Sequence, residues 1–198
     1  KKLVNLKPIL KNVIKMKLHT VIGFDGTVPS GLTLHPSRQH ILYPLGSTII
    51  VKNLLETAKS GSTAKDSSRF LKGHTGPITC VAMSPSGKYV ASGQSTHMGF
   101  RASVIIWDYE SGAIIHKLDL HKVKVQCLSF TSDEKYLLSV GGEDDGNITV
   151  WDVKEGKAVC GTTSTHVTNC AAFFSISIRS CRSPEMPPAR FAFMAAQL

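Results

Sequence analysis

A spaced pair of dipeptides occurs twice in this chain, and it constrains the fold more than any other feature. Gly73-His74 is followed by Trp107-Asp108, and the pattern returns as Leu120-His121 followed by Trp151-Asp152. Self-similarity with a period of about 40–45 residues is typical of proteins that stack equivalent structural units. One such unit does not bury its own apolar faces, so neighbouring units must cover them. We therefore expect a repeat protein.

The residues between these dipeptides also repeat. Residues 80–92 align with residues 127–139 at a constant offset of 47. A degenerate upstream copy, residues 35–42, aligns with residues 84–91 at an offset of 49, and Val51-Lys52-Asn53 stands where Trp-Asp is expected. Cys170-Ala171-Ala172-Phe173 begins a fourth copy and then loses the pattern. The sequence thus predicts three recognisable units and the start of a fourth.

Each copy predicts four short strands, because alternating apolar segments rich in β-branched residues are separated by turn residues. In the better-defined copies the expected strands cover residues 78–83, 89–94, 103–107 and 113–118, and then 123–130, 136–140, 147–151 and 158–160. Four strands per unit, with a Gly-His before them and a Trp-Asp on the third strand, are typical of a WD-repeat β-propeller blade. The expected fold is all-β, a partial array of such blades.

The motif residues suggest a buried hydrogen-bonded network. In WD-repeat blades a His, a Ser or Thr of the second strand, an Asp of the next turn and the Trp form a chain across the blade, because a buried indole or imidazole needs partners. The later copy offers His121, Ser139, Asp145 and Trp151. The earlier copy offers His74, Ser92 and Trp107 but no Asp in residues 95–102, so we expect an incomplete network there.

Catalytic and ligand-binding alternatives are disfavoured. A Ser–His–Asp set suggests a hydrolase, but the repeat assigns all three residues to the network and no Gly-x-Ser-x-Gly motif occurs. Residues 143–146, Glu-Asp-Asp-Gly, favour a tight turn over a cation site, and the His spacings match no metal site. No phosphate-binding Gly-rich motif is present. We expect no enzyme activity, no cofactor, no metal and no small-molecule substrate.

The net charge of +9 does not indicate a nucleic-acid-binding protein. Residues 1–18 contain six Lys and no acidic residue, and residues 175–198 carry a net charge of +2, so residues 19–174 carry only +1. A basic groove on the repeat body is not expected, and no segment is long and apolar enough to span a membrane. The five Cys follow no disulfide or zinc pattern, and Cys80, Cys127 and Cys170 share one repeat position; we expect reduced thiols in a cytoplasmic protein.

Two insertions interrupt the repeats. Residues 54–68 are rich in Ser, Thr and Lys and predict a projecting loop between a third and a fourth strand. Residues 95–102 contain Met98, Phe100 and Arg101. Either the two apolar side chains fold back on the blade, or all three residues contact a partner.

The expected organisation has three parts. Residues 1–19 form a basic extension, and residues 20–174 form the partial propeller, with repeats at about 20–68, 69–112, 113–156 and an incomplete 157–174. Residues 175–198 form an atypical tail that fits no blade and suggests an aberrant terminus. An open arc would leave apolar end faces uncovered, including Ile49, Ile50, Val51, Phe173 and Phe174, so we expect self-association or a requirement for a partner.

Several segments go beyond the general repeat pattern. The most specific are Tyr43-Pro44-Leu45-Gly46 and Met98-Gly99-Phe100, since no blade requires them; others are residues 21–26, 28–32, 91–94, 106–109, 120–122 and 141–146. Over about residues 20–174 the chain resembles the N-terminal propeller of the cilia- and flagella-associated WD-repeat proteins that lie inside axonemal doublet microtubules.

The resemblance implies a structural role. It implies a microtubule inner protein of ciliary and flagellar axonemes that binds tubulin and neighbouring inner-junction proteins and supports ciliary motility. Because one propeller fold has many unrelated partners, the alternative is a soluble WD-repeat adaptor for signalling or ubiquitin-ligase complexes. Cosedimentation with doublet microtubules distinguishes the two.

Overall fold

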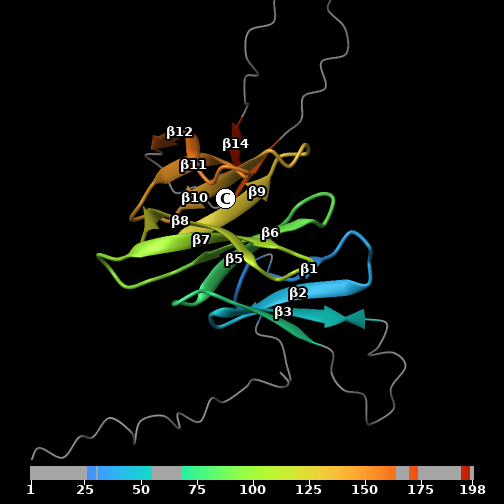
Figure 1. Ribbon diagram of the computed structural model, residues 1–198. Helices are drawn as coiled ribbons and strands as arrows, with labels where there is room; N and C mark the ends of the chain where they lie inside the picture. The colour runs from blue at the N-terminus through green and yellow to red at the C-terminus, as the bar shows by residue number, and fades with distance from the viewer. Residues whose placement is uncertain (1–25, 30, 55–67, 164–169, 174–192, 197–198) are drawn as a thin grey trace, which may run out of the picture.

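Three four-stranded antiparallel sheets, stacked one on another, form the body of the protein (Figure 1). The computed structural model describes residues 26–29, 31–54, 68–163, 170–173 and 193–196. Within each sheet the strands follow chain order, so each strand pairs with its neighbours in the sequence. This is the meander expected for a propeller blade, and the all-β prediction is confirmed.

The first sheet is the degenerate copy. Its strands are β1 (Thr33–Leu34), β2 (His40–Leu45), β3 (Thr48–Asn53) and β4 (Arg69–Lys72). Gly46 has a φ of +56°, a backbone conformation that favours glycine, and it allows the tight turn between β2 and β3. The insertion separates β3 from β4 as expected. Whether it forms a projecting loop depends on residues 55–67, which lie outside the described residues.

The second and third sheets match the predicted strands closely. The second comprises β5 (Ile78–Met83), β6 (Tyr89–Gln94), β7 (Arg101–Asp108) and β8 (Ile114–Lys122), and the third comprises β9 (Val125–Phe130), β10 (Tyr136–Gly141), β11 (Asn147–Asp152) and β12 (Ala158–Thr163). The sheets are offset from the proposed repeat divisions. Residues 69–112 supply the outer strand of the first sheet and three strands of the second, so each sequence repeat spans two blades.

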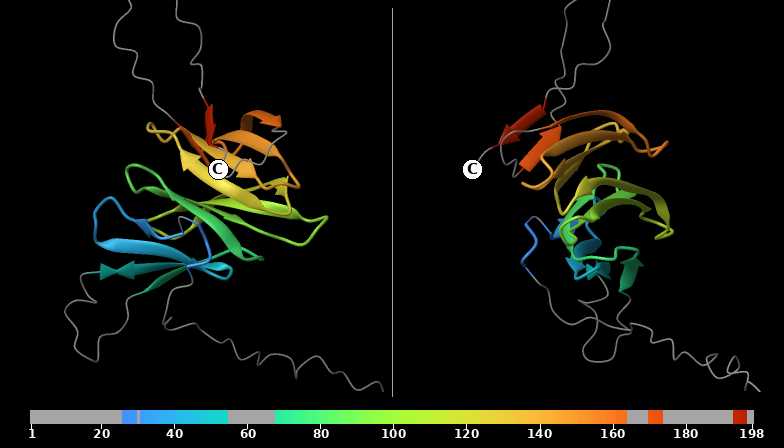
Figure 2. Two further views of the ribbon diagram at one scale, coloured as in Figure 1. Left: turned by 180° about the vertical axis from the view of Figure 1, so that it is seen from behind. Right: turned by 90° about the vertical axis from the view of Figure 1, so that its left-hand side faces the viewer.

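Apolar side chains fill the spaces between the sheets. Between the first and second sheets, Leu42 and Ile49 pack with Ile105 and Trp107. A second cluster, between the second and third sheets, contains Val104, Leu118, Val125, Leu137 and Trp151. Each Trp therefore lies between its own blade and the preceding one. The edge-on view in Figure 2 shows the sheets stacked face to face across these layers.

The apolar end of the first sheet is not exposed, contrary to expectation. Ile49, Ile50 and Val51 are 0%, 1% and 1% exposed. Ile49 and Val51 pack in the cluster that faces the second sheet, which covers them. Of the other two residues expected on open faces, the side chain of Phe173 and all of Phe174 lie outside the described residues.

The fourth copy begins where the repeat places it. β13 (Cys170–Phe173) pairs with β14 (Phe193–Ala196), and Phe173 is opposite Phe193. β13 lies beside β9, as β9 lies beside β5, so the first strands of successive sheets are neighbours. Within the described part of the chain, no helix has the length and apolar character needed to cross a membrane.

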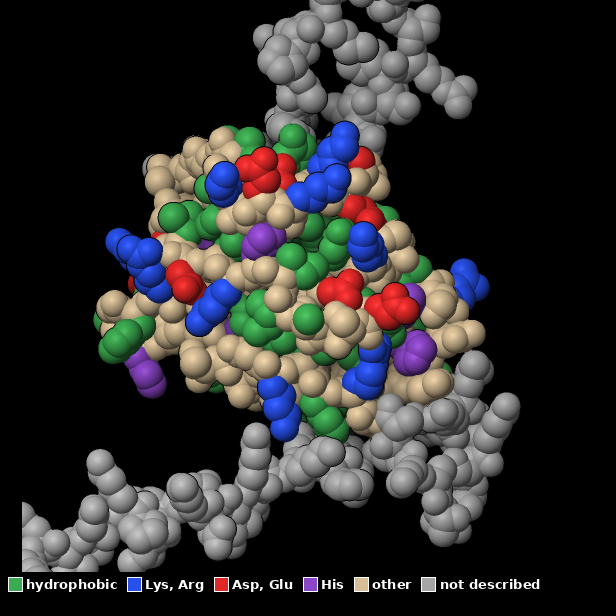
Figure 3. All heavy atoms as spheres, viewed as in Figure 1, with side chains coloured by type: hydrophobic (Ala, Val, Ile, Leu, Met, Phe, Trp, Pro, Cys, Tyr) green, Lys and Arg blue, Asp and Glu red, His purple; other side chains and the backbone are tan. Residues whose placement is uncertain are grey.

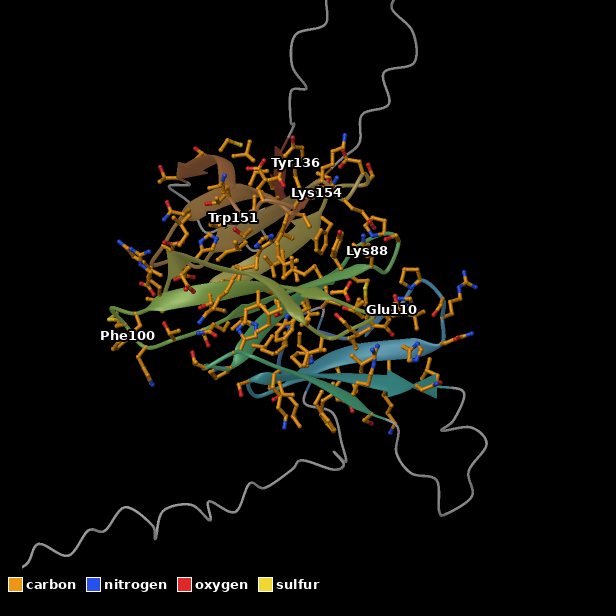
Figure 4. All side chains as sticks on the ribbon, viewed as in Figure 1. Lys88, Phe100, Glu110, Tyr136, Trp151 and Lys154 are labelled. Carbon is orange, nitrogen blue, oxygen red and sulfur yellow. The ribbon has the colours of Figure 1, made fainter. Side chains whose placement is uncertain are left out.

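Two contacts at equivalent positions link the outer strands to the following sheets. Arg69 on β4 donates to the carbonyl oxygens of Tyr109 and Glu110 at 3.1 and 2.9 Å. His116, 47 residues after Arg69, contacts the carbonyl oxygen of Lys154 at 2.9 Å. Figure 4 shows Glu110 and Lys154 in the turns after the two Trp-Asp pairs. The repeat therefore specifies contacts between blades as well as within them.

The Asp of each Trp-Asp pair shapes the turn that follows it. The Asp108 carboxylate accepts hydrogen bonds from the backbone N–H and hydroxyl of Ser111, which lower its pKa. Asp152 accepts from the backbone N–H groups of Lys154 and Glu155. Short polar side chains that cap their own turn in this way are common in tight turns. The dipeptide thus combines a core Trp with a turn-forming Asp.

Candidate functional site

A four-membered hydrogen-bonded network joins the third sheet to the outer strand of the second. The Trp151 indole N–H donates to Ser139 Oγ at 2.7 Å, and Ser139 Oγ lies 2.6 Å from His121 Nε2. His121 Nδ1 lies 2.6 Å from Asp145 Oδ2. Asp145 Oδ1 also accepts from the Asn147 side-chain amide at 2.8 Å. The structure thus brings together the four residues proposed from the sequence.

The network is buried, and its members come from two sheets. The side chains of His121 and Asp145 are both 0% exposed, and Ser139 is fully buried. A carboxylate only accepts hydrogen bonds, so Nδ1 of His121 carries the proton that faces Asp145. His121 lies on β8, the outer strand of the second sheet, while Ser139 and Trp151 lie in the third. The network therefore connects two blades.

The second sheet contains the same chain of contacts with a different end. The Trp107 indole N–H donates to Ser92 Oγ at 2.7 Å, and Ser92 Oγ lies 2.7 Å from His74 Nε2. His74 Nδ1 contacts Gln94 Oε1 at 2.8 Å. The expectation of an incomplete network is therefore wrong, because an amide at the end of β6 takes the place of the missing carboxylate.

Gln94 is well satisfied in this position. Its Oε1 also accepts from the backbone N–H of Thr75 at 3.2 Å, and its amide nitrogen donates to Thr75 Oγ1 at 3.2 Å. Gln94 is 1% exposed and His74 is 8% exposed. Burial lowers the pKa of His74 below its usual value, although the Gln94 hydrogen bond acts in the opposite direction. Burial thus favours the neutral form of the His74 imidazole in this network.

These networks do not form an accessible catalytic site. Ser92 and Ser139 are both 0% exposed, and each hydroxyl is already bonded to a Trp and a His. A nucleophile must be reachable by its substrate. Within the described residues, no group of three or more His, Cys, Asp or Glu side chains is placed to hold a metal ion. The arrangement suits packing and blade alignment.

The three proposed partner-contact residues lie at a separate, exposed hairpin tip, on the turn and at the start of β7. Met98 is 80% and Phe100 67% exposed, and Arg101 is exposed as well. The two apolar side chains therefore do not fold back on the blade. Figure 4 shows Phe100 at the far tip of the hairpin between β6 and β7, away from the other labelled residues.

A hollow lies beside this tip. It has a volume of about 520 Å³ and is lined by Thr75, Pro77, Ser95, Phe100 and Arg101, among others. Thr75 and Pro77 come from the connection between the first and second sheets, and the other three from the β6–β7 hairpin. Sequence reasoning had not identified this hollow, because its walls come from segments that are distant in the chain.

The family model described as WD domain, G-beta repeat matches residues 65–108 and 112–152. Both matches end at the Asp of a Trp-Asp pair, and each contains the His, Ser and Trp of one network. This chain is a WD-repeat protein.

The WD-repeat chain is similar to cilia- and flagella-associated protein 52 from two distant organisms. It is 48% identical to the Chlamydomonas reinhardtii protein over 161 residues, or 81% of this chain. It is 42% identical to the Homo sapiens protein over 150 residues, or 76% of this chain. The chain spans only about a quarter of the length of these relatives, 25% and 23% respectively.

A solved structure supports the fold assignment. The crystal structure of RRP9 WD40 repeats superimposes with a TM-score of 0.57 and 23% sequence identity. The superposition covers 71% of this WD-repeat chain and 40% of the other chain. At this identity the likeness shows the arrangement of the blades.

Proposed function

We propose that this chain is a non-catalytic scaffold of ciliary and flagellar axonemes. The observation that carries the proposal is the 48% identity, over 81% of the chain, to a protein whose name associates it with cilia and flagella. Identity at this level extends well beyond the residues that a WD-repeat blade requires. The buried, fully bonded Ser92 and Ser139 hydroxyls support a role in contact over catalysis.

The finer proposal is that the protein is a microtubule inner protein. In this role it binds tubulin and other inner-junction proteins of the doublet microtubule and supports ciliary motility. The segments that no blade requires, Tyr43-Pro44-Leu45-Gly46 and Met98-Gly99-Phe100, support it as candidate partner-specific surfaces. The second of these is the exposed tip described above. Neither nucleic acid nor a membrane is among the proposed partners.

Cosedimentation tests this function directly. The protein is mixed with salt-washed doublet microtubules and, in parallel, with singlet microtubules assembled from purified tubulin. We expect it to pellet with the doublets, and a tagged copy in ciliated cells to remain with axonemes after detergent extraction. A protein that stays in the supernatant, and is evenly expressed in cells without motile cilia, would instead be the soluble adaptor.

A further inference from the structure

The tip of the β6–β7 hairpin exposes apolar surface in a way that a blade does not require. Met98 and Phe100 are 80% and 67% exposed and lie on one tight turn. Single exposed apolar residues are common, but neighbouring ones on a projecting element mark contact sites. Met, Phe and Arg are also enriched at the centres of protein interfaces. The tip therefore has the composition of an interface.

The tip is held in one conformation by its own hydrogen bonds. The Phe100 N–H donates to the His97 carbonyl at 3.2 Å, and Thr96 Oγ1 donates to the Phe100 carbonyl at 3.2 Å. The Thr96 N–H donates to the Val123 carbonyl at 2.6 Å, and the Val123 N–H donates to the Phe100 carbonyl at 3.2 Å. These bonds anchor the tip to the β8–β9 connection. A surface ordered before binding loses less entropy when a partner docks.

Cations without acidic partners flank the tip. Arg101 lies directly opposite Lys122 in the β7–β8 ladder, and like charges in this position destabilise a sheet. Arg101 donates to the backbone carbonyl of Asp119 at 2.9 Å, which leaves its charge unpaired. Among the described residues, the ion pairs are His121–Asp145, Lys135–Asp133 and Lys157–Glu155, and none includes either cation. An acidic ligand would relieve this repulsion.

We propose that Met98, Phe100, Arg101 and Lys122 form a docking site for an acidic protein segment that carries an apolar side chain. The carboxylates would pair with the two cations, and the apolar side chain would enter the hollow of about 520 Å³ beside Phe100. In Figure 3 hydrophobic and His side chains lie at the left edge of the molecule, below Lys and Arg side chains that have Asp or Glu side chains beside them. This inference rests on the proposed scaffold role and specifies the chemistry of one partner.

A protein partner fits this surface better than a nucleic acid or a membrane. A phosphate backbone is bound through rows of cations, whereas this tip exposes the apolar side chains of Met98 and Phe100. A membrane-inserting loop needs only a convex apolar tip, but this tip has a hollow at its side lined by Thr75 and Ser95. Such a hollow accepts a side chain and offers it polar partners.

The test measures binding of the full chain to a defined probe. The probe is a short fluorescent peptide of alternating Glu and Gly with a central Leu-Leu pair, followed by anisotropy. We expect saturable binding that weakens with salt, and a loss of affinity of about tenfold or more in Arg101→Glu/Lys122→Glu. Lys117→Glu, an exposed charge on the same β8 strand, is the matched control and should bind as the unmodified chain does. Met98→Ser/Phe100→Ser should also lose about tenfold, whereas Ile115→Ser should not.

Three further ligands test whether binding depends on the acidic groups and on a protein partner. The peptide with Gln in place of Glu, phosphatidylserine vesicles and a single-stranded oligonucleotide are titrated under the same conditions, after circular dichroism shows that each variant is folded. Binding only to vesicles or oligonucleotide, equal binding of the Gln peptide, or no binding of the Glu peptide would overturn the proposal. No axonemal component is present, so loss of peptide binding and failure to pellet with doublets are independent results.

Discussion

The networks of the second and third sheets share three residue types and differ in the fourth. In both, a buried Trp donates to a Ser, and the Ser contacts a His at 2.6 to 2.7 Å. The second network ends on the neutral amide of Gln94 and the third on the carboxylate of Asp145. Both networks therefore supply a buried acceptor for His Nδ1, and they supply it with different residue types.

The two acceptors occupy the same space from different positions in the chain. At the repeat offset of 47, Gln94 aligns with Gly141, and both positions end the second strand of their sheets. A Cβ atom at Gly141 would lie 2.0 Å from Asp145 Oδ2. The third sheet thus needs a glycine so that the Asp from the following turn can reach His121. In the second sheet the equivalent residue is Gln94, and its own side chain contacts His74.

The largest expected effect is loss of either Trp. Trp107 is 1% and Trp151 6% exposed, and each fills the layer between two sheets. We expect Trp107→Ala and Trp151→Ala each to lower the free energy of unfolding by about 3–5 kcal/mol, through lost packing and the loss of a buried hydrogen bond to a Ser. His121→Ala should have a similar effect. Urea denaturation followed by circular dichroism measures it, and an effect in only one blade would break the comparison.

Asp145 should matter far more than its neighbour Asp144. The side chain of Asp145 is buried and accepts hydrogen bonds from His121 and Asn147, whereas Asp144 is exposed. We expect Asp145→Ala to cost about 2–3 kcal/mol, because hydrogen bonds to a charged acceptor are the stronger kind. Asp144→Ala should change stability by less than about 0.5 kcal/mol. Equal thermal shifts in the two variants would show that the third network is wrongly assigned.

Gln94→Ala should have a smaller effect than Asp145→Ala. It removes a neutral acceptor from His74 Nδ1 and leaves that buried atom unpaired. We expect a loss of about 1–2 kcal/mol in the free energy of unfolding, measured by the same urea titration. His97→Ala, in the exposed loop three residues later, is a control for local disturbance. A Gln94→Ala variant as stable as the unmodified chain would mean that the amide does not complete the network.

The smallest effect concerns pH. Burial, partly offset by the Gln94 bond, lowers the pKa of His74 below its usual 6.5, so the unfolded chain binds a proton there more readily than the folded chain. Stability from this site is therefore full above about pH 6.5 and is lost as the pH falls through the folded pKa. We expect the melting-temperature difference between the unmodified chain and His74→Gln to shrink between pH 7.5 and 5.5. A constant difference would contradict a buried neutral imidazole.

Much of this fold can be predicted from the repeat. β5 and β6 have the predicted bounds, Ile78–Met83 and Tyr89–Gln94, because their alternation and turn residues are strong local signals. The contacts of His121, Ser139, Asp145 and Trp151 can likewise be predicted, since each keeps its repeat position. Gln94 is not predicted by the repeat pattern, because that pattern places the acceptor as an Asp in the following loop and not at the position that aligns with Gly141.

The remaining differences arise from tertiary context. Ile49 and Val51 are expected to be exposed if the first sheet is an uncovered end of the array. In the structure they face the second sheet, which covers them. The position of Met98 and Phe100 depended on where β7 begins. β7 starts at Arg101, two residues earlier than predicted, so the shortened loop cannot fold back on the blade. Strand ends depend on cross-strand pairing, which local sequence does not specify.

The most direct test of the shared network uses the two tryptophans of the chain, which give two indole N–H signals in a nitrogen–proton NMR spectrum. Both indole protons are buried and donate to a Ser hydroxyl at 2.7 Å. We predict that both exchange slowly with D₂O, that Ser92→Ala accelerates exchange of Trp107 alone, and that Ser139→Ala accelerates exchange of Trp151 alone. If one indole exchanged freely in the unmodified chain, or if both responded to one substitution, the two sheets would not contain separate and equivalent networks.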